Sequence, residues 1–403
     1  MSIDYVSVYY GQADATSISM IGIVDTAKSI IWHSVYFGVG DFEVFAPATK
    51  QNLKLLQVNN FVTRPNSREV GIIEKIEIAH EPHHGMMITA TGRFAKSILD
   101  RRLVRGEAYV AYEDRTFFSS AWRYSMNVEE EVHEKVRWCF DPGDDSVDIP
   151  FFRVAPIAGI QKEFAYDGET PPHPHNIKIP VQSLLTYTED VLRLHGMAST
   201  VYLDDDNAQL RYVVYEGTDR SVSGGIDRPI VFSKDFDNLT SSNYMRDISA
   251  RKTVAFIRIP CENIAIGDEH QHYEQYGDAK GLERYEFIVD ATTDTVSYVG
   301  EDGHIKEDAD VPAIMESYFQ VARPLMTGTY GAELFDGKIN LVSSQWELGK
   351  DFFLGDIVTI QDNDLGKYVD VRVTEILETQ DENGYSIEAV TEIYEGATNN
   401  GKL

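Results

Sequence analysis

Two segments of the chain, about 300 residues apart, share the pattern of one β-motif. The first segment is 61–91 and the second is 356–390. Each has a strand that ends in Val-Thr, a polar turn, a strand that ends in alternating Glu and Ile, a turn closed by Gly, and a last strand that ends in Ala. Such a duplication predicts an α+β, mainly β chain with two similar β-barrel-like domains.

The pattern extends upstream in both halves. Residues 41–49 and 284–292 both have a charged residue, an aromatic residue, Glu and apolar residues in nearly the same order, and both end in Ala-Thr. We therefore expect each copy of the motif to begin at least one strand earlier. In the first half, the strands predicted at 17–24, 29–37 and 42–47 form a β-meander.

The two halves are separated by a region of mixed pattern. Residues 128–138 predict an amphipathic helix, and 184–195 predict a second helix with Ser183 as its N-cap and Gly196 as its stop. Shorter helices are expected at 48–58, 95–103 and 312–323. The predicted division is as follows: 1–106, first barrel-like domain; 107–225, α+β insert; 226–305 with 341–395, second barrel-like domain; 306–340, helical insert; 396–403, flexible tail.

The charge balance restricts the partners of this chain. With 403 residues and 43% hydrophobic content, the chain is long enough for several domains with cores. Its formal net charge of -29 repels phosphate, so nucleic acid is not expected to be wrapped by this surface. DNA that passes through an acidic lumen without specific binding is compatible with that charge.

The two cysteines, Cys139 and Cys261, lie far apart and belong to no Cys-x-x-Cys motif. We interpret them as buried or free thiols of a protein assembled in a reducing cytoplasm. The N-terminus has neither a basic nor an apolar segment of a signal peptide, and no apolar run is long enough to span a membrane.

An ordered set of short stretches resembles a phage family, the hub proteins at the tail tip of long-tailed siphoviruses, which are related to the hub part of tail-associated lysins. The resemblance implies a homotrimer in which two barrel domains per chain form a pseudo-hexamer around the tail axis. It further implies a structural virion component at the tail tip, assembled in the host cytoplasm and active in genome ejection. The stretches are 29–32, 40–44, 70–74, 92–94, 97–102, 231–233, 236–239 and 354–358.

This implied symmetry agrees with the duplication. Three chains with two similar domains each present six contact surfaces to a hexameric tail end, and one three-fold face to the tip. The implied partners are the distal tail ring protein, other tail-tip proteins and the tape-measure protein. An obligate interface of this kind is expected to bury more than ~2,000 Å² per pair, and exposed edges such as 17–24 would be covered by a neighbour.

One basic cluster stands out in the acidic chain, and it has two interpretations. Its side chains form ion pairs within or between subunits, or they contact an acidic partner or DNA at the channel wall. Aromatic and acidic residues in the stretches of resemblance are added as candidates for interface contacts. The candidates are Lys96, Arg101, Arg102, Arg105, Trp32, Asp41 and Phe42.

The sequence has no motif that predicts catalysis. The acidic stretches 141–148 and 204–207 lack the EF-hand spacing, and the histidines of 80–84 have no counterpart in the second segment. Neither a nucleophile elbow nor a phosphate-binding loop occurs, and we do not expect the C-terminal lytic extension that many members of the resembled family carry. We expect no catalytic, metal or cofactor site; a cell-wall hydrolase with paired carboxylates and a glycan-binding adhesin remain the alternatives.

Overall fold

The computed structural model describes most of the chain. Several sequence features lie outside the described residues: most of the acidic stretch 141–148, His83, the histidines at 173 and 175, Arg105, most of the helix expected at 312–323, and the tail 396–403. The described residues are 5–11, 16–82, 84–104, 109–112, 115–118, 121–140, 148–164, 178–179, 182–263, 268–290, 296–298, 319, 322, 325–326, 332–339, 341, 344–364 and 366–394.

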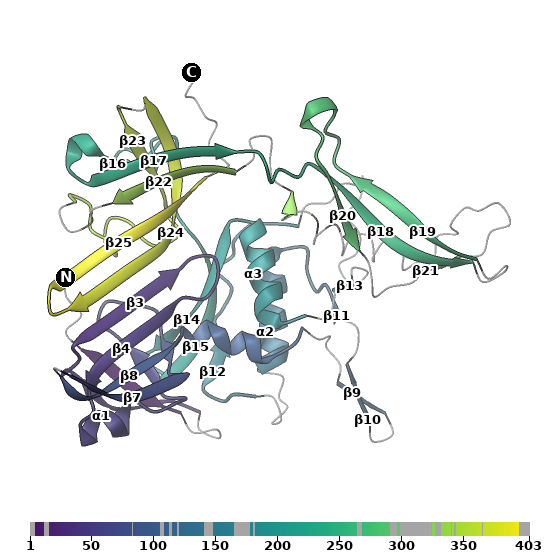
Figure 1. Ribbon diagram of the computed structural model, residues 1–403. Coiled ribbons are helices and arrows are strands. Elements are labelled where there is room, and N and C mark those ends of the chain that lie inside the picture. The colour runs from purple at the N-terminus through teal and green to yellow at the C-terminus, as the bar shows by residue number, and fades with distance from the viewer. Residues whose placement is uncertain are drawn as a thin grey trace.

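The largest element is an eight-stranded sheet that contains strands from both ends of the chain. Its order is β16-β23-β24-β3-β4-β8-β7, and β25 also pairs with β24. In Figure 1 the purple strands of the first half and the yellow strands of the second half lie side by side at β3 and β24. The strands are β3 (Ser29–Val35), β4 (Asp41–Pro47), β7 (Lys75–Glu81), β8 (Gly85–Arg93), β16 (Val231–Ser233), β23 (Ile357–Asp362), β24 (Lys367–Asp381) and β25 (Gly384–Ile393).

A four-stranded sheet of order β2-β1-β5-β6 packs beside the first half of the large sheet. The helix expected at 48–58 is the short α1 (Lys50–Leu55), which is capped by the Thr49 side chain. The helix expected at 95–103 is a 3-10 helix, η1 (Ala95–Arg101). The strands are β1 (Val6–Tyr10), β2 (Ser19–Val24), β5 (Phe61–Thr63) and β6 (Gly71–Ile72).

The middle of the chain folds as an α+β unit, as its pattern predicts. The helix α2 (Val128–Phe140) packs against α3 (Leu184–Leu194), which has Ser183 as its N-cap residue and ends before Gly196 in a left-handed conformation. The strands of this region are β9 (Tyr109–Tyr112), β10 (Arg115–Phe118), β11 (Ala121–Trp122), β12 (Phe152–Val154), β13 (Lys178–Ile179), β14 (Met197–Asp204) and β15 (Gln209–Glu216).

A further sheet lies on the opposite side of the molecule from β3 and β4 (Figure 1). It interrupts a hairpin, because β17 (Leu239–Asp247) pairs with β22 (Ala332–Ile339) and the sheet lies between them in the chain. Two short 3-10 helices, η3 (Lys234–Phe236) and η4 (Gly281–Glu283), flank β17 and β20. The strands of this sheet are β18 (Val254–Asn263), β19 (Asp268–Tyr276), β20 (Glu286–Asp290) and β21 (Val296–Tyr298).

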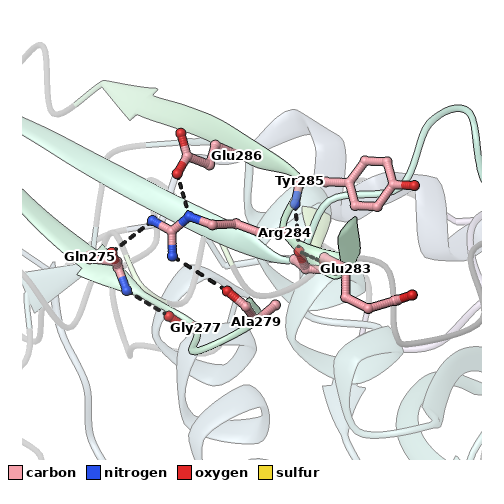
Figure 2. A network of polar contacts seen from close by, with 8 residues as sticks. Gln275, Gly277, Ala279, Glu283, Arg284, Tyr285 and Glu286 are labelled. Atoms are coloured by element: carbon pink, nitrogen blue, oxygen red, sulfur yellow. Dashed lines mark hydrogen bonds and ion pairs between the residues drawn. The ribbon is translucent and has the colours of Figure 1, made fainter. Parts of the chain in front are cut away.

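The predicted equivalence of 284–292 with 41–49 is wrong. β4 pairs with β8 in the large sheet, whereas β20 runs parallel to β18 in the further sheet. Figure 2 shows Arg284 fixed there: its guanidinium donates to Gln275 Oε1 at 2.9 Å and also to Glu286 and the Ala279 carbonyl. A short run of charged, aromatic and apolar residues fits any half-buried strand, so it does not identify a particular one.

The expectation of closed barrels is not confirmed. Within the described residues the large sheet is open, with β16 and β7 at the ends of its order. The physical reason is that β24 continues past its own half of the molecule and pairs with β3 of the other half. Each half still has its own core, one around Trp32, Val62 and Phe94 and the other around Phe232, Val358 and Val371.

Candidate assembly interface

The two segments with similar sequence fold as the same three-stranded motif. In the first copy, β5 pairs with β6, and β7 pairs with β8. In the second copy, β23 pairs with β24, and β24 pairs with β25. The single strand β24 thus takes the place of both β6 and β7. The separation of β6 from β7 at Ile73 and Glu74 corresponds to a register shift in β24 between Val373 and Glu375.

Backbone hydrogen bonds are repeated in the two copies at corresponding positions. They lie where the first strand of the motif meets the middle strand, and where the last strand leaves the motif. The pairs are Ile73 N to Asn60 O (2.9 Å) with Val373 N to Asp356 O (2.9 Å), Asn59 N to Ile73 O (2.8 Å) with Gly355 N to Val373 O (2.8 Å), and Ala95 N to Val70 O (2.6 Å) with Tyr394 N to Asp370 O (3.0 Å).

The cross-strand register is repeated as well, and it corrects the sequence alignment. The sequence pattern aligns Gly71 of the first copy with Val369 of the second. The hydrogen-bonded pairs instead make Gly71 equivalent to Val371, two residues later. The matched cross-strand pairs are Phe61–Ile72 with Ile357–Arg372, Gly71–Phe94 with Val371–Ile393, and Lys75–Thr91 with Glu375–Val390.

The backbone conformations agree even where the residue types differ. Asn59 (φ 68°) and Gly355 (φ 93°) are equivalent and are both left-handed. An L-residue other than Gly or Asn rarely adopts this conformation. Gly85 (φ 78°) and Gly384 (φ 111°) each follow the hairpin turn, as the sequence predicts. The duplication is therefore a property of the fold, and it was detectable from the turn residues.

The two halves of the chain are joined directly by β24 and β3, and this junction within one chain is the candidate functional site. Residues 375–380 of β24 pair antiparallel with residues 30–35 of β3. The backbone N–H of Tyr36 continues the ladder, donating to Thr374 O at 2.7 Å. One motif thus uses the outer edge of its middle strand to bind a strand of its neighbour.

A buried polar network closes this junction. Arg64 of the first copy forms an ion pair with Glu378 of β24, and both side chains are less than a tenth exposed. The Tyr385 hydroxyl donates to the other Glu378 oxygen at 2.6 Å, and Arg64 stacks 5.6 Å from the Trp32 ring centre. Burial lowers the pKa of Arg64 to about 10. Because both charges are paired and bonded, separating the two copies would leave buried charges unpaired.

Trp32 and Phe42 lie in the core and do not face a partner. Trp32 is fully buried, stacks against Phe94 at 4.9 Å, and donates through its indole N–H to the Ser67 hydroxyl at 3.1 Å. Phe42 is 3% exposed and lies 5.7 Å from the same indole ring. The prediction that these two aromatics contact a partner is not supported, because alternating aromatic residues in a strand fill its own core.

Asp41 lies at the exposed rim of the junction. Its carboxylate is 2.9 Å from His33 Nδ1, and the other ring nitrogen of His33 is 2.9 Å from Glu375 Oε2 of β24. His33 of β3 therefore links an acid of β4 to an acid of β24. This contact is partly exposed, so it contributes less than the buried network.

A second joint ties the middle unit to both copies. The fully buried Tyr36 hydroxyl donates to Gly196 O at 3.0 Å and accepts from Gly217 N–H at 3.1 Å. Burial raises the pKa of Tyr36 to about 12. Arg372 stacks 5.2 Å from the Tyr36 ring and donates to Gly355 O at 2.6 Å. These contacts make the α+β unit part of the same rigid junction.

The basic cluster is divided by the fold. Lys96 is buried and lies 2.9 Å from Glu189 of α3, in agreement with intramolecular ion pairing. Arg102 stacks on Phe140 of α2 at 5.3 Å, and Arg101 is exposed. Arg105 lies outside the described residues. The described residues of this cluster therefore form no continuous basic surface. A contact of Arg101 with DNA stays a prediction.

The residues that make the junction polar, Arg64 and Glu378, are not predicted from the sequence. Glu378 lies within β24 and is 3% exposed. A usable signal existed, because Glu378 follows Ile376 in the alternating pattern of buried positions. A carboxylate at such a position requires a buried cation, although the sequence does not show that the cation is Arg64.

The comparisons with known proteins agree with this fold. A family model, described as Siphovirus ReqiPepy6 Gp37-like protein, matches residues 15–391. The tail protein from Neisseria meningitidis MC58 has a TM-score of 0.51 at 11% identity, over 97% of this chain and 97% of that chain. The 43 kDa tail protein of prophage MuSo2 from Shewanella oneidensis has a TM-score of 0.50 at 12% identity, over 96% and 98%. No curated protein matches. At 11% and 12% identity, the likeness to these two structures concerns the fold alone.

Proposed function

Because the chain belongs to the siphovirus ReqiPepy6 Gp37-like family, a family of siphovirus tail proteins, we propose that it is the tail-tip hub. In this proposal three copies join the hexameric end of the tail to a trimeric tip and close the DNA channel. The role is structural, and the chain needs no catalytic site for it. Receptor contact would shift the subunits and release the closure.

One observation carries this proposal: a single chain contains the same β-motif twice, with the same hydrogen bonds and register. Three chains then present six similar motifs, which is the number that a six-fold ring requires. The α+β unit in the middle of the chain and the sheet of β18 to β21 differ from this motif in fold, so they would keep only three-fold symmetry in the assembly. A duplicated motif would be redundant in a monomer.

The proposed partners follow from the position of a hub. They are the distal tail ring protein, other tail-tip proteins and the tape-measure protein. The net charge of -29 is compatible with a lumen through which DNA passes without being bound. Among the described residues, no helix is long and apolar enough to cross a membrane.

We also propose a changed division of the second half. The notional barrel of 226–305 with 341–395 contains β18, β19 and β20, but these strands pair with one another and not with β23, β24 or β25. β22 instead contacts β25 and pairs with β17. The second hub domain would then consist of 226–247 and 332–394, with the sheet of 254–298 as its insert.

Measurement of the particle mass in solution tests this proposal. We expect a species of three times the chain mass, and end-on electron microscopy views of it with six similar densities around a pore. A stable monomer, even after addition of the distal tail ring protein, would contradict the proposal. A trimer without the six densities would refute the ring geometry alone.

A further inference from the structure

The edge of β24 that binds β3 has a counterpart in the first copy, and that counterpart has no partner. The middle strand of each motif has one edge on its hairpin partner, β8 or β25. The other edge of β24 binds β3, but the same edge of β7 ends the eight-stranded sheet. Within the residues that the structure describes, no strand pairs with β7 on that side.

Side chains of β7 are more exposed than the side chains at the equivalent positions of β24. Ile78 is 47% exposed, whereas the equivalent Glu378 is 3% exposed. Ile76 is partly buried, and its equivalent Ile376 is 2% exposed. β7 is seven residues long and contains no proline, and it holds Ile78 outward beside the exposed Lys75 and Glu77, which pair with each other at 3.1 Å. Such an edge is usually blunted in a monomeric protein, because its unpaired N–H and C=O groups recruit another strand.

The backbone groups of β7 are set for a strand on its outer side. In β24 the Thr374 carbonyl accepts from the backbone N–H of Tyr36. Hydrogen-bonded pairs alternate along an antiparallel strand, so the backbone N–H and C=O groups of the even-numbered residues of β24 point toward β3. By the equivalence of the two copies, the N–H groups of Ile76, Ile78 and His80 point outward. The outer edge of β7 therefore has the same donors as the covered edge of β24.

The strand that would complete this edge also exists in the chain. β3 covers β24, and its counterpart in the second half is β17. β3 pairs with β4, which borders β8 and precedes β5 in the chain. β17 pairs with β22, which contacts β25 and precedes β23. Among described residues β17 has β22 as its one partner strand, so its other edge is available.

We propose that the outer edge of β7 in one chain pairs with the free edge of β17 in the next copy of this chain. This inference rests on the proposed trimer and names its interface. The joint between chains repeats the joint that β24 and β3 make within a chain. Each chain offers one β7 edge and one β17 edge, so the contact is head-to-tail, and in the proposed trimer three such contacts close a ring. Six joints result, three within chains and three between them.

A matched pair of substitutions tests the interface. Ile78→Lys puts a charge on the β7 edge. Ile21→Lys does the same on β2, the rival edge for which the sequence alone predicts a covering neighbour, and Ile21 is 43% exposed. We expect Ile78→Lys to weaken trimer formation roughly tenfold or more, since edge lysines oppose strand addition. Ile21→Lys should leave the trimer intact. Unchanged circular dichroism would show that each variant folds.

Disulfide trapping tests the partner strand. Ala79 is equivalent to Thr379, which lies opposite Ile31 between hydrogen-bonded pairs, where cross-strand side chains are closest. Each variant carries Ala79→Cys together with one further cysteine at a β17 position of the same chain. The unsubstituted chain shows whether Cys139 and Cys261 form disulfides by themselves. We expect one β17 position to give dimers and trimers on non-reducing gels. The positions are Ser241, Asn243, Met245 and Asp247.

The outcomes separate this inference from the proposed function. A monomeric wild-type chain would overturn the trimer and with it the interface. A wild-type trimer that Ile78→Lys leaves intact, with no disulfide from Ala79→Cys to any β17 position, would overturn the interface alone. A trimer lost on Ile21→Lys but not on Ile78→Lys would place the contact at β2 instead.

Discussion

The outer edges of β7 and β24 belong to the same motif, yet among the described residues only the β24 edge is paired with another strand. Residues 375–380 pair with β3, while residues 75–80 end the sheet. The two edges have equivalent backbone geometry, so the difference comes from their position in the chain and not from the motif itself. A duplicated motif in one chain can satisfy one of its two joints, and the second joint needs another copy.

The strongest test of this comparison removes the charge at the covered edge. Glu378→Ala leaves Arg64 buried without its carboxylate and the Tyr385 hydroxyl without its acceptor. We expect a loss of about 3–5 kcal/mol in the free energy of unfolding, as for other broken buried ion pairs. Denaturant unfolding at high dilution measures it.

The matched control is the equivalent position at the bare edge. Ile78→Ala should change the free energy of unfolding of the dilute chain by less than about 0.5 kcal/mol, because the side chain is nearly half exposed. Equal losses at the two positions would mean that the chain covers β7 by itself, and the comparison would fail.

A second test compares the equivalent left-handed residues. In Gly355→Ala, the new Cβ would lie 2.1 Å from the Tyr36 ring, in addition to the unfavourable φ of 93°. We expect roughly 3 kcal/mol of destabilisation, from overpacking and backbone strain together. Asn59→Ala adds the backbone strain without a new atom and should cost about 1 kcal/mol. Thermal unfolding of the two variants measures the difference, and a larger loss for Asn59→Ala would contradict the assigned contacts.

The sequence predicted the duplication well because its signals are local. Gly85 and Gly384 each follow a hairpin turn, and the strands on both sides of each turn alternate apolar and polar residues, as half-buried strands do. The junction was not predictable in this way. Glu378 meets Arg64 across 314 residues, and no local pattern identifies which strand will lie beside another. The charged-aromatic run at 284–292 shows the limit, because its pattern fits a strand of the further sheet equally well.

A third test uses a place where the copies differ chemically. Glu69 of the first copy is equivalent to Val369 and accepts from the Thr200 hydroxyl of the middle unit at 2.9 Å. Burial raises the pKa of Glu69 above its ordinary 4.5, so the folded chain holds this proton more tightly than the unfolded chain. Stability should therefore fall as pH rises from 4.5 through the folded pKa. Glu69→Gln should remove this slope and raise the thermal midpoint at neutral pH, and an unchanged slope would contradict the assignment.

The smallest effect is expected at the exposed rim of the junction. His33 bridges Asp41 and Glu375 at 2.9 Å each, but all three side chains are about a third or more exposed. Because solvent screens such pairs, His33→Ala should cost about 0.5 kcal/mol or less in unfolding free energy. Denaturant unfolding at low and high salt measures the loss, which salt should reduce. A loss comparable to that of Glu378→Ala would mean that the rim, and not the buried Arg64 network, holds the two motifs together.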